Sequence, residues 1–326
     1  MSKTFLTWIS APLLALVVAA GPAKAGYPER PVSLVVTSTP GSPLDVLGRT
    51  LAAEAAKDLG QTVIVENRAG ASGNIAGSYV AHSAPDGYTL ILTLANLVTV
   101  NPLLMTDTQF NASTALEPVA HIGSFSQVLV VPKRLGVNSL DALVELARKR
   151  DLTYATAGAG SPGHLTMAAF ALATGIATLT HVPYKGNPPA VNDLLGGIVD
   201  TGFLVASGVL PHIKTGAFVP LAVSGKTRSD LLPGVPTVAE SRIPGTGDFD
   251  LTFGYLVAMP KGTPPQLIER WNTLLHDILR RPSVQDRLKA MDTRPVFSTP
   301  EETRRSLANE SRRMKEIVER ANIRIN

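Results

Sequence analysis

The sequence has no cysteine among its 326 residues. Disulfide bonds, thiolate metal sites and cysteine nucleophiles are therefore excluded for this chain. Aromatic residues make up only 5% of the chain, and long basic runs are absent despite a formal net charge of +4. Proteins that bind nucleic acids gather basic and often aromatic side chains, so we expect no nucleic-acid partner. The hydrophobic content of 44% suffices for a large core, and the length favours two lobes over one.

The first residues have the pattern of an export signal. Lys3 provides a positive start, Ala11–Ala20 is an apolar run, and Ala23-Lys24-Ala25 is an A-x-A cleavage site. The apolar run is much shorter than the ~20 residues that span a bilayer. We therefore predict a signal peptide over residues 1–25, cleavage after Ala25 and a periplasmic mature protein. Nucleotides are scarce in that compartment, which argues against a nucleotide cofactor.

Strands and helices alternate in the first part of the mature chain. Hydrophobic patterning predicts strands over Pro31–Thr37, Thr62–Glu66 and Tyr88–Leu94, with helices over Asp45–Leu59 and Asn74–His82 between them. This order predicts a parallel sheet with helices on both faces. Ligands of such sheets bind beyond the carboxyl ends of the strands, where all three following loops begin.

A second alternation follows, and it predicts a second α/β lobe. The further predicted strands are Val119–Gly123, Gln127–Val131, Leu152–Ala155, Leu179–Pro183, Ile198–Leu204, Pro220–Val223 and Leu251–Met259. The further predicted helices are one capped by Ser139, one from Ser161 to Gly175, Pro189–Leu195, Pro211–Thr215, a helix start within Leu231–Glu240, and a helical tail with capping boxes at Thr263–Gln266 and Thr299–Glu302. We predict that residues 26–125 and 252–326 form the first lobe and residues 126–251 the second.

Small polar residues form several strand-to-helix corners. Thr39–Ser42, Ala69–Asn74 and Thr156–His164 consist largely of Gly, Ser, Thr and Asn, and Ala95-Asn96 opens a further corner. Free backbone N–H groups and the helix dipole make such corners natural anion sites. Few charges lie in these loops, so we expect a carboxylate to be held by N–H groups, hydroxyls and water. Several such bonds between two lobes suffice for micromolar binding, about −8 kcal/mol.

Two sharper interpretations of the loop at Gly158–Gly163 fail on chemistry. The loop matches G-x-G-x-x-G, but the next strand, Thr180–Pro183, is not followed by the acidic residue that a dinucleotide ribose needs. Ser161 also resembles the nucleophile of a hydrolase elbow. The residue after that nucleophile must donate its N–H to the oxyanion, and Pro162 has none. Ser161 is better interpreted as a helix N-cap or a ligand-contacting hydroxyl, and His164 either caps the helix or touches the ligand.

A metal site is not indicated either. No two of the six histidines have the spacing of helical metal ligands, and no carboxylate completes a cluster. Glu66-Asn67-Arg68 at a strand end fits internal pairing that shapes the loop, with direct ligand contact as the alternative. We therefore expect no metal and no cofactor.

The mature chain resembles the Bug-type extracytoplasmic solute receptors of tripartite tricarboxylate transporters. The segments that carry the resemblance follow in order along the chain: Tyr27–Pro31, Val63–Ala71, Gly73-Asn74, Pro85–Leu90, Asn101-Pro102, the loop through His164-Leu165, His181–Gly186, Pro211–Ile213, Pro233–Glu240 and Gly262–Pro264. Each segment alone is a weak signal, whereas their order and coverage are specific.

The resemblance implies a two-lobed α/β periplasmic binding protein of the Venus-flytrap, type II-like form, and not an enzyme. It implies a small carboxylate or related polar ligand between the lobes, passed on to the membrane permease subunits of the transporter. We expect the receptor to be a monomer. The family contacts fall here on Gly41, Ser42, Ser72, Gly73, Asn74, Gly160, Ser161 and His164, and also on Thr156 and Asn96. An exported serine hydrolase using Ser161 and a receptor that presents its ligand to a sensor remain the alternatives.

The chain departs from the family pattern at two places. The first family loop usually reads Pro-Gly-Gly, whereas this chain has Pro40-Gly41-Ser42-Pro43. Ser42 adds a hydroxyl but restricts the backbone, and Pro43 removes a backbone donor. Family members often have an Asp after the position of Phe203, whereas this chain has Leu204-Val205-Ala206. An Asp facing the cleft could bind an amine or a hydroxyl, so its absence argues against an amino-acid ligand and favours a plain or aromatic carboxylate.

Overall fold

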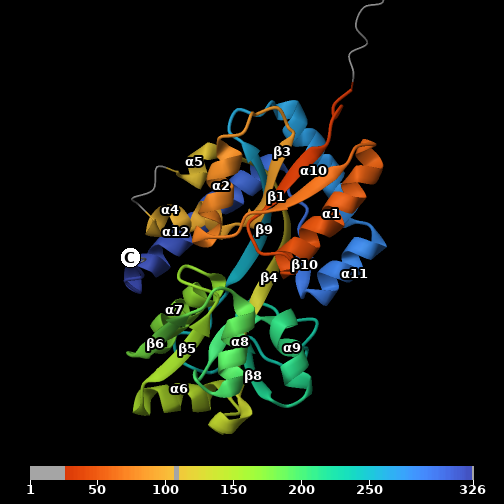
Figure 1. Cartoon of the computed structure of the whole chain (residues 1–326). Helices are drawn as coiled ribbons and strands as arrows, with labels where there is room; N and C mark the ends of the chain where they lie inside the picture. Colours follow the sequence, from red (N-terminus) through yellow and green to blue (C-terminus); the bar gives the residue numbers. More distant parts are fainter. Residues whose placement is uncertain (1–25, 106–109, 325–326) are drawn as a thin grey trace, which may run out of the picture.

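A computed structural model describes residues 26–105 and 110–324 (Figure 1). The predicted signal peptide and its cleavage site lie outside the described residues. The strands are β1 (Val32–Val36), β2 (Val63–Asn67), β3 (Thr89–Leu94), β4 (Leu116–Pro132), β5 (Leu152–Thr156), β6 (Leu179–Pro183), β7 (Gly202–Val205), β8 (Phe218–Val223), β9 (Thr252–Pro260) and β10 (Thr293–Pro295). The helices are α1 (Pro43–Leu59), α2 (Asn74–Ala81), α3 (Asn96–Thr99), α4 (Asn101–Leu104), α5 (Ala112–Ala115), α6 (Leu140–Lys149), α7 (Pro162–Thr174), α8 (Asn187–Gly196), α9 (Ala206–Lys214), α10 (Pro265–Leu279), α11 (Pro282–Ala290) and α12 (Pro300–Arg320).

The first lobe contains the predicted parallel unit. β1 pairs in parallel with both β2 and β3, so the carboxyl ends of all three strands lie at one edge. The sheet continues antiparallel through β9, β4 and β10, in the order β10-β4-β9-β3-β1-β2. Figure 1 shows α1, α10 and α11 on one side of this sheet and α2, α4 and α12 on the other. The parallel part of the prediction is confirmed, and the sheet as a whole is mixed.

β4 runs through both lobes as one strand. The prediction of separate strands at Val119–Gly123 and Gln127–Val131 is therefore wrong, because the intervening Ser124, Phe125 and Ser126 keep extended pairing with β9. β4 pairs with β9 up to Ser126 and with β7 and β8 from Gln127 onward. Tertiary pairing thus overrides the weak strand propensity of the serines. The division of the chain into lobes at these crossings stays a prediction.

The second lobe is built around the end of β4 and a separate small sheet. β5 and β6 pair in parallel, and Tyr154 on β5 bridges to Thr201 next to β7. The strand predicted from Ile198 begins only at Gly202, because Ile198 lies exposed in the preceding turn. The short helix predicted at Pro211 is instead the end of the longer α9, with Pro211 inside it.

Local capping signals explain where the helices begin. The capping box at Thr299 is confirmed, since its hydroxyl accepts from the N–H of Glu302 and the Glu302 carboxylate accepts in return. The box predicted at Thr263 is wrong, because its hydroxyl donates to the carbonyl of Pro260 and leaves α10 without a side-chain cap. Residues 231–240 form turns without the predicted helix start.

Hydrophobic side chains of α1 cover the sheet of the first lobe. Leu44, Leu47 and Leu51 lie buried in one cluster with Val32 and Val36 of β1. Helical spacing puts these leucines on one face, and α1 begins after the cap residue Ser42 and ends at Gly60 in the left-handed conformation. This packing fixes the corner between β1 and α1, which is the first of the predicted site loops.

Candidate ligand site between the two lobes

The first corner already holds a carboxylate of the protein itself. The N–H of Gly41 donates to Asp45 Oδ2 at 2.8 Å, and the hydroxyl of Ser42 accepts from the N–H of Asp45 at 3.2 Å. Asp45 is 2% exposed and is also bonded by Arg49 and by Asn67 Nδ2 at 2.8 Å. The Gly41 donor of this corner is thus occupied by Asp45 of the protein itself. Contact of this corner with an external ligand stays a prediction.

The second corner holds an unusual backbone. Ala71 and Ser72 have φ values of 45° and 52°, which are costly for residues with a Cβ, and Gly73 has φ 95°. Buried Asn101 supports the turn, since its Nδ2 donates to the carbonyl of Ser72 at 3.1 Å and to Asn74 Oδ1 at 2.8 Å. This strain, held by a buried amide, orients the N-terminus of α2 and is typical of functional loops.

The corner after β3 meets the second lobe directly. Asn96, at the start of α3, is 5% exposed, and its Nδ2 donates to the carbonyl of Gly160 at 3.3 Å. Its other amide atom, Oδ1, is buried and has no hydrogen-bond partner among the described residues. A flipped amide would put two oxygens together, so the hydrogen bond to Gly160 supports this orientation. The structure therefore brings two predicted residues from different lobes into contact.

Ser161 stands at the first turn of α7 with its hydroxyl unused. It occupies the N-cap position, with φ −68° and ψ 161°, but its side chain makes no capping bond. Its Oγ is buried and has no partner among the described residues. Buried polar atoms are nearly always satisfied by protein, water or ligand. The ligand-contact interpretation of Ser161 therefore fits its surroundings better than the capping one.

Two histidines stack behind this corner. The ring of His164 lies 3.9 Å from that of His181 with an interplanar angle of 12°, and Tyr154 stacks on His181 at 5.0 Å. Burial, with a further effect of His181, lowers the pKa of His164 to about 4, and burial lowers the pKa of His181 to about 4. Both rings are neutral at pH 7. Since Nδ1 of His164 accepts from the N–H of Gly160 at 3.1 Å, its hydrogen lies on Nε2.

Thr156 holds the base of the same loop. Its hydroxyl lies 2.7 Å from Nε2 of His181 and accepts from the N–H of Gly158 at 3.2 Å. The loop can turn because Gly158 and Gly160 have φ values of 127° and 72°. Thr156 therefore acts on a ligand through the loop that it orders, and it has no free donor of its own.

The geometry does not support a serine hydrolase at Ser161. A nucleophilic serine needs a base within hydrogen-bond reach, whereas the Oγ of Ser161 has no partner among the described residues. Nδ1 of His164 is bound to the backbone of Gly160 instead. Within residues 26–105 and 110–324, no group of three His, Asp or Glu side chains could hold a metal ion.

Comparison with known proteins identifies the family. Residues 47–323 match the model of a protein family described as "Tripartite tricarboxylate transporter family receptor". The chain belongs to the tripartite tricarboxylate transporter receptor family. A relative of the receptor is Protein BugT of Bordetella pertussis, 37% identical over 322 residues that cover 98% of each chain. The family expected from the sequence motifs is therefore confirmed, and it consists of solute-binding receptors rather than enzymes.

Two solved structures resemble the receptor closely. The R. palustris protein Rpa4515 with adipate has a TM-score of 0.84 and 33% identity, over 92% of the receptor and 99% of that chain. MatC from Rhodopseudomonas palustris with bound malate has a TM-score of 0.78 and 27% identity, over 90% of the receptor and 100% of that chain. These likenesses confirm the predicted two-lobed α/β fold of a periplasmic binding protein.

Three residues that support the site were not singled out by the sequence. Asp45 accepts from the N–H of Gly41 in the first corner, and Asn101 supports the second corner. His181 stacks on His164 at the end of the Thr156–His164 loop. Their roles depend on contacts between segments far apart in the chain, although Asn101 and His181 lie in family motifs.

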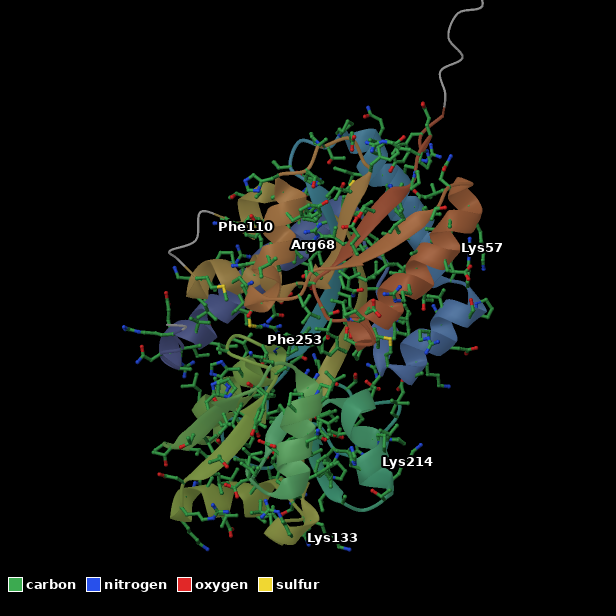
Figure 2. The ribbon with its side chains drawn as sticks, in the orientation of Figure 1. Lys57, Arg68, Phe110, Lys133, Lys214 and Phe253 are labelled. Atoms are coloured by element: carbon green, nitrogen blue, oxygen red, sulfur yellow. The ribbon has the colours of Figure 1, made fainter. Side chains whose placement is uncertain are left out.

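Figure 2 shows Lys57, Lys133 and Lys214 on the outside of the receptor, and buried Phe253 where the lobes meet. The internal pairing expected of Glu66 and Arg68 is confirmed at 3.4 Å.

Proposed function

We propose that the receptor binds a small carboxylate between its lobes, in the periplasm, and delivers it to the membrane permease of a tripartite tricarboxylate transporter. One observation carries this proposal. The hydroxyl of Ser161 and Oδ1 of Asn96 come from different lobes, close to the contact of Asn96 with Gly160. Both atoms are buried and have no hydrogen-bond partner in the part of the chain that the structure describes. Such atoms are costly unless a ligand or water satisfies them.

The available groups suit a carboxylate without a salt bridge. The Ser161 hydroxyl and Nε2–H of neutral His164 are donors, and the N-terminus of α7 adds partial positive charge. Asn96 Oδ1 is an acceptor, so it suits a ligand hydroxyl, a protonated carboxyl or a bridging water. Hydrogen bonds to a charged acceptor contribute about 1.5–3 kcal/mol each, which makes these few donors sufficient.

Two similar proteins support the choice of ligand class. Rpa4515 was solved with adipate and MatC with malate, and both are dicarboxylates. The family to which the chain belongs supports the proposed delivery to a permease. We further propose that residues 1–25 are removed on export and that the receptor acts as a monomer without a cofactor. The ten residues predicted from the sequence are the proposed ligand contacts, with Thr156 acting through its loop.

Calorimetry on the refolded, ligand-free protein tests this function. We expect binding of at least one acid from a panel of adipate, malate, tricarboxylates and aromatic carboxylates. Ser161→Ala should weaken that binding about tenfold or more while leaving the free energy of unfolding unchanged, since it removes a buried hydroxyl that has no partner among the described residues. The matched control is Thr166→Val on the same helix, whose hydroxyl donates to Pro162 O at 2.8 Å. Thr166→Val should lower the free energy of unfolding and bind the acid with wild-type affinity.

Two results would contradict the proposal. The first is the absence of heat and of thermal shift with every acid of the panel. The second is wild-type affinity in Ser161→Ala, which would place the ligand away from the contact between Asn96 and Gly160.

A further inference from the structure

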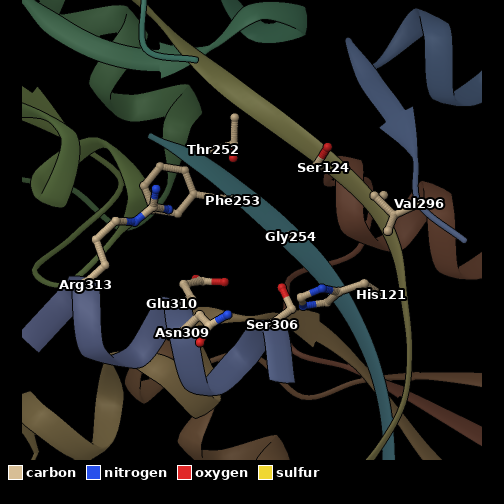
Figure 3. A pocket seen from close by; sticks show the side chains of 11 residues that line it. His121, Ser124, Thr252, Phe253, Gly254, Val296, Ser306, Asn309, Glu310 and Arg313 are labelled. Atoms are coloured by element: carbon tan, nitrogen blue, oxygen red, sulfur yellow. The ribbon is translucent and has the colours of Figure 1, made fainter. Parts of the chain in front are cut away.

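A cavity with charged and polar side chains in its lining lies outside the set of proposed ligand contacts. Its volume is about 370 Å³, and none of the ten predicted contact residues lines it. It lies between α12 and the strands β4 and β9, close to where these strands pass from one lobe to the other (Figure 3). A volume of this order accommodates a small molecule. The cavity adjoins the corner after β3, where the N–H of Ala95 donates to the carbonyl of Gly254, but it shares no lining residue with the predicted contacts.

His121 directs an unsatisfied nitrogen to this cavity. Its ring points into the cavity in Figure 3, the residue is 8% exposed, and Nε2 has no hydrogen-bond partner among the described residues. Gly254 makes room for the ring, because a Cβ there would lie 3.3 Å from Nε2. Burial lowers the pKa of His121, so the ring is neutral and can accept a hydrogen bond. A buried polar atom of this kind calls for a partner.

Glu310 and Arg313 of α12 face the same cavity without pairing with each other. Glu310 accepts from the Thr99 hydroxyl at 3.1 Å, and Arg313 donates to the carbonyl of Asp250 at 3.1 Å. Residues three apart on a helix are neighbours and usually pair when their charges are opposite. Elsewhere on α12 they do so, as Arg304 does with Glu301 at 2.5 Å. Among the described residues, Glu310 and Arg313 form no ion pair.

The charge of Glu310 is only partly compensated by the protein. Burial raises the pKa of this carboxyl, while the Thr99 hydroxyl and the Arg313 charge lower it to a lesser degree. A cation close to Glu310 would stabilise the charged form. Arg313 is exposed and lies at the opposite side of the cavity lining from His121, with Glu310 between them. Its guanidinium suits an anion.

We propose that this cavity binds a small zwitterion that carries an amino group and a carboxylate. The ammonium group donates to the Glu310 carboxylate and to Nε2 of His121, and the carboxylate accepts from Arg313. Asn309 and Ser306 supply further hydrogen bonds from the same face of α12. A plain carboxylate would be repelled by Glu310, and a plain amine by Arg313, so the pair of charges selects for both groups together.

Calorimetry or ligand-observed NMR on the mature protein tests this site. The probes are glycine, β-alanine and γ-aminobutyrate, with acetate, propionate, methylamine and propylamine as matched single-charge compounds. We expect at least one zwitterion to bind with a Kd below about 1 mM. The single-charge compounds should bind at least about tenfold more weakly than that zwitterion, or not at all. Gly160→Val should keep the affinity for the zwitterion, because Gly160 lies in the other site. This control separates the inference from the proposed carboxylate function.

Variants of α12 identify the groups. Glu310→Gln and Arg313→Gln should each weaken zwitterion binding at least about tenfold, since each removes a charged partner. Glu316→Gln and Arg320→Gln alter an exposed pair of the same helix at 3.4 Å and should bind as wild type. Arg313 is exposed, so its variant serves alone if Glu310→Gln does not fold.

Three results would overturn the inference. One is that every zwitterion binds more weakly than about 1 mM, the affinity that corresponds to a binding free energy of about −4 kcal/mol. Another is wild-type affinity in folded Arg313→Gln. The third is loss of zwitterion binding in Gly160→Val with an intact fold, which would place the ligand in the carboxylate site.

Discussion

The rings of His164 and His181 lie parallel, 3.9 Å apart, although the residues come from different elements, α7 and β6. The stack couples the first turn of α7 to the small sheet of the second lobe. One ring accepts from the N–H of Gly160, and the other contacts the hydroxyl of Thr156 at 2.7 Å. Two neutral rings thus hold the Thr156–His164 loop in place without adding charge.

The stability of the receptor should fall in mild acid through this pair. The pKa of each histidine is lowered by burial from 6.5 to about 4 in the folded protein. Between these values the unfolded chain binds more protons, so the free energy of unfolding decreases as the pH falls from 6.5 to 4. Above pH 6.5 these two groups add no pH dependence. Urea unfolding should show that the free energy of unfolding decreases less between pH 6.5 and 4 in His181→Phe than in the wild type. This variant keeps a stacked ring but cannot titrate.

The exposed His82 provides the control for this pH effect. His82→Gln should retain the wild-type pH dependence, because its side chain lies outside the stack. An equal decrease in wild type and His181→Phe would show that other groups, such as buried carboxylates, account for the acid sensitivity.

Gly160→Val should weaken carboxylate binding more than Lys185→Ala. Gly160 has φ 72°, its N–H donates to His164, and its carbonyl accepts from Asn96. A β-branched residue in this conformation costs about 1–3 kcal/mol and shifts both bonds. Lys185 is exposed, and we expect a change below about threefold. Calorimetry with the bound acid compares the two variants, and equal affinities of Gly160→Val and wild type would refute the prediction.

Gly163→Ala should destabilise the second lobe. An added Cβ would lie 2.4 Å from the carbonyl oxygen of Phe203, so α7 must move away from β7. Overpacking of this kind costs about 1–3 kcal/mol. The control is Gly196→Ala near the end of α8, where a Cβ meets no atom within 4 Å and stability should be kept. Urea unfolding measures both, and an unchanged midpoint in Gly163→Ala would contradict the close packing of α7.

Thr299→Ala should destabilise the first lobe through α12. The Thr299 hydroxyl caps the helix at the N–H of Glu302, 3.2 Å away, and such caps contribute about 0.5–2 kcal/mol. Thr299→Ser retains the hydroxyl and should lose only a few tenths of a kcal/mol. Equal unfolding midpoints for Thr299→Ala and wild type would show that the cap does not stabilise the fold.

Much of the fold was predictable because its signals are local. The parallel β1–β3 unit follows from alternating strand and helix patterns, and helices such as α1 carry their own cap residues, Ser42 and Gly60. The capping box at Thr299 succeeded for the same reason. The box at Thr263 failed because its hydroxyl found a competing acceptor in Pro260, which the sequence pattern does not distinguish.

The candidate site was predictable only in outline. Its corners were visible as small polar residues after strands. The hydrogen bonds of these corners were not predictable, because the partner of each donor is often a residue that lies far away in the chain. Asp45 occupies the donor of Gly41, whereas the hydroxyl of Ser161 has no partner among the described residues, although both corners contain a Gly-Ser-Pro step.

The sequence by itself determined the family, the α/β alternation and the position of the corners, because these depend on residue order and local backbone preference. Only the tertiary structure decided that β4 passes through both lobes, that Asn96 meets Gly160, and that His121 and Glu310 face one cavity. These features arise from long-range strand pairing and burial, where packing outweighs the preferences of single residues.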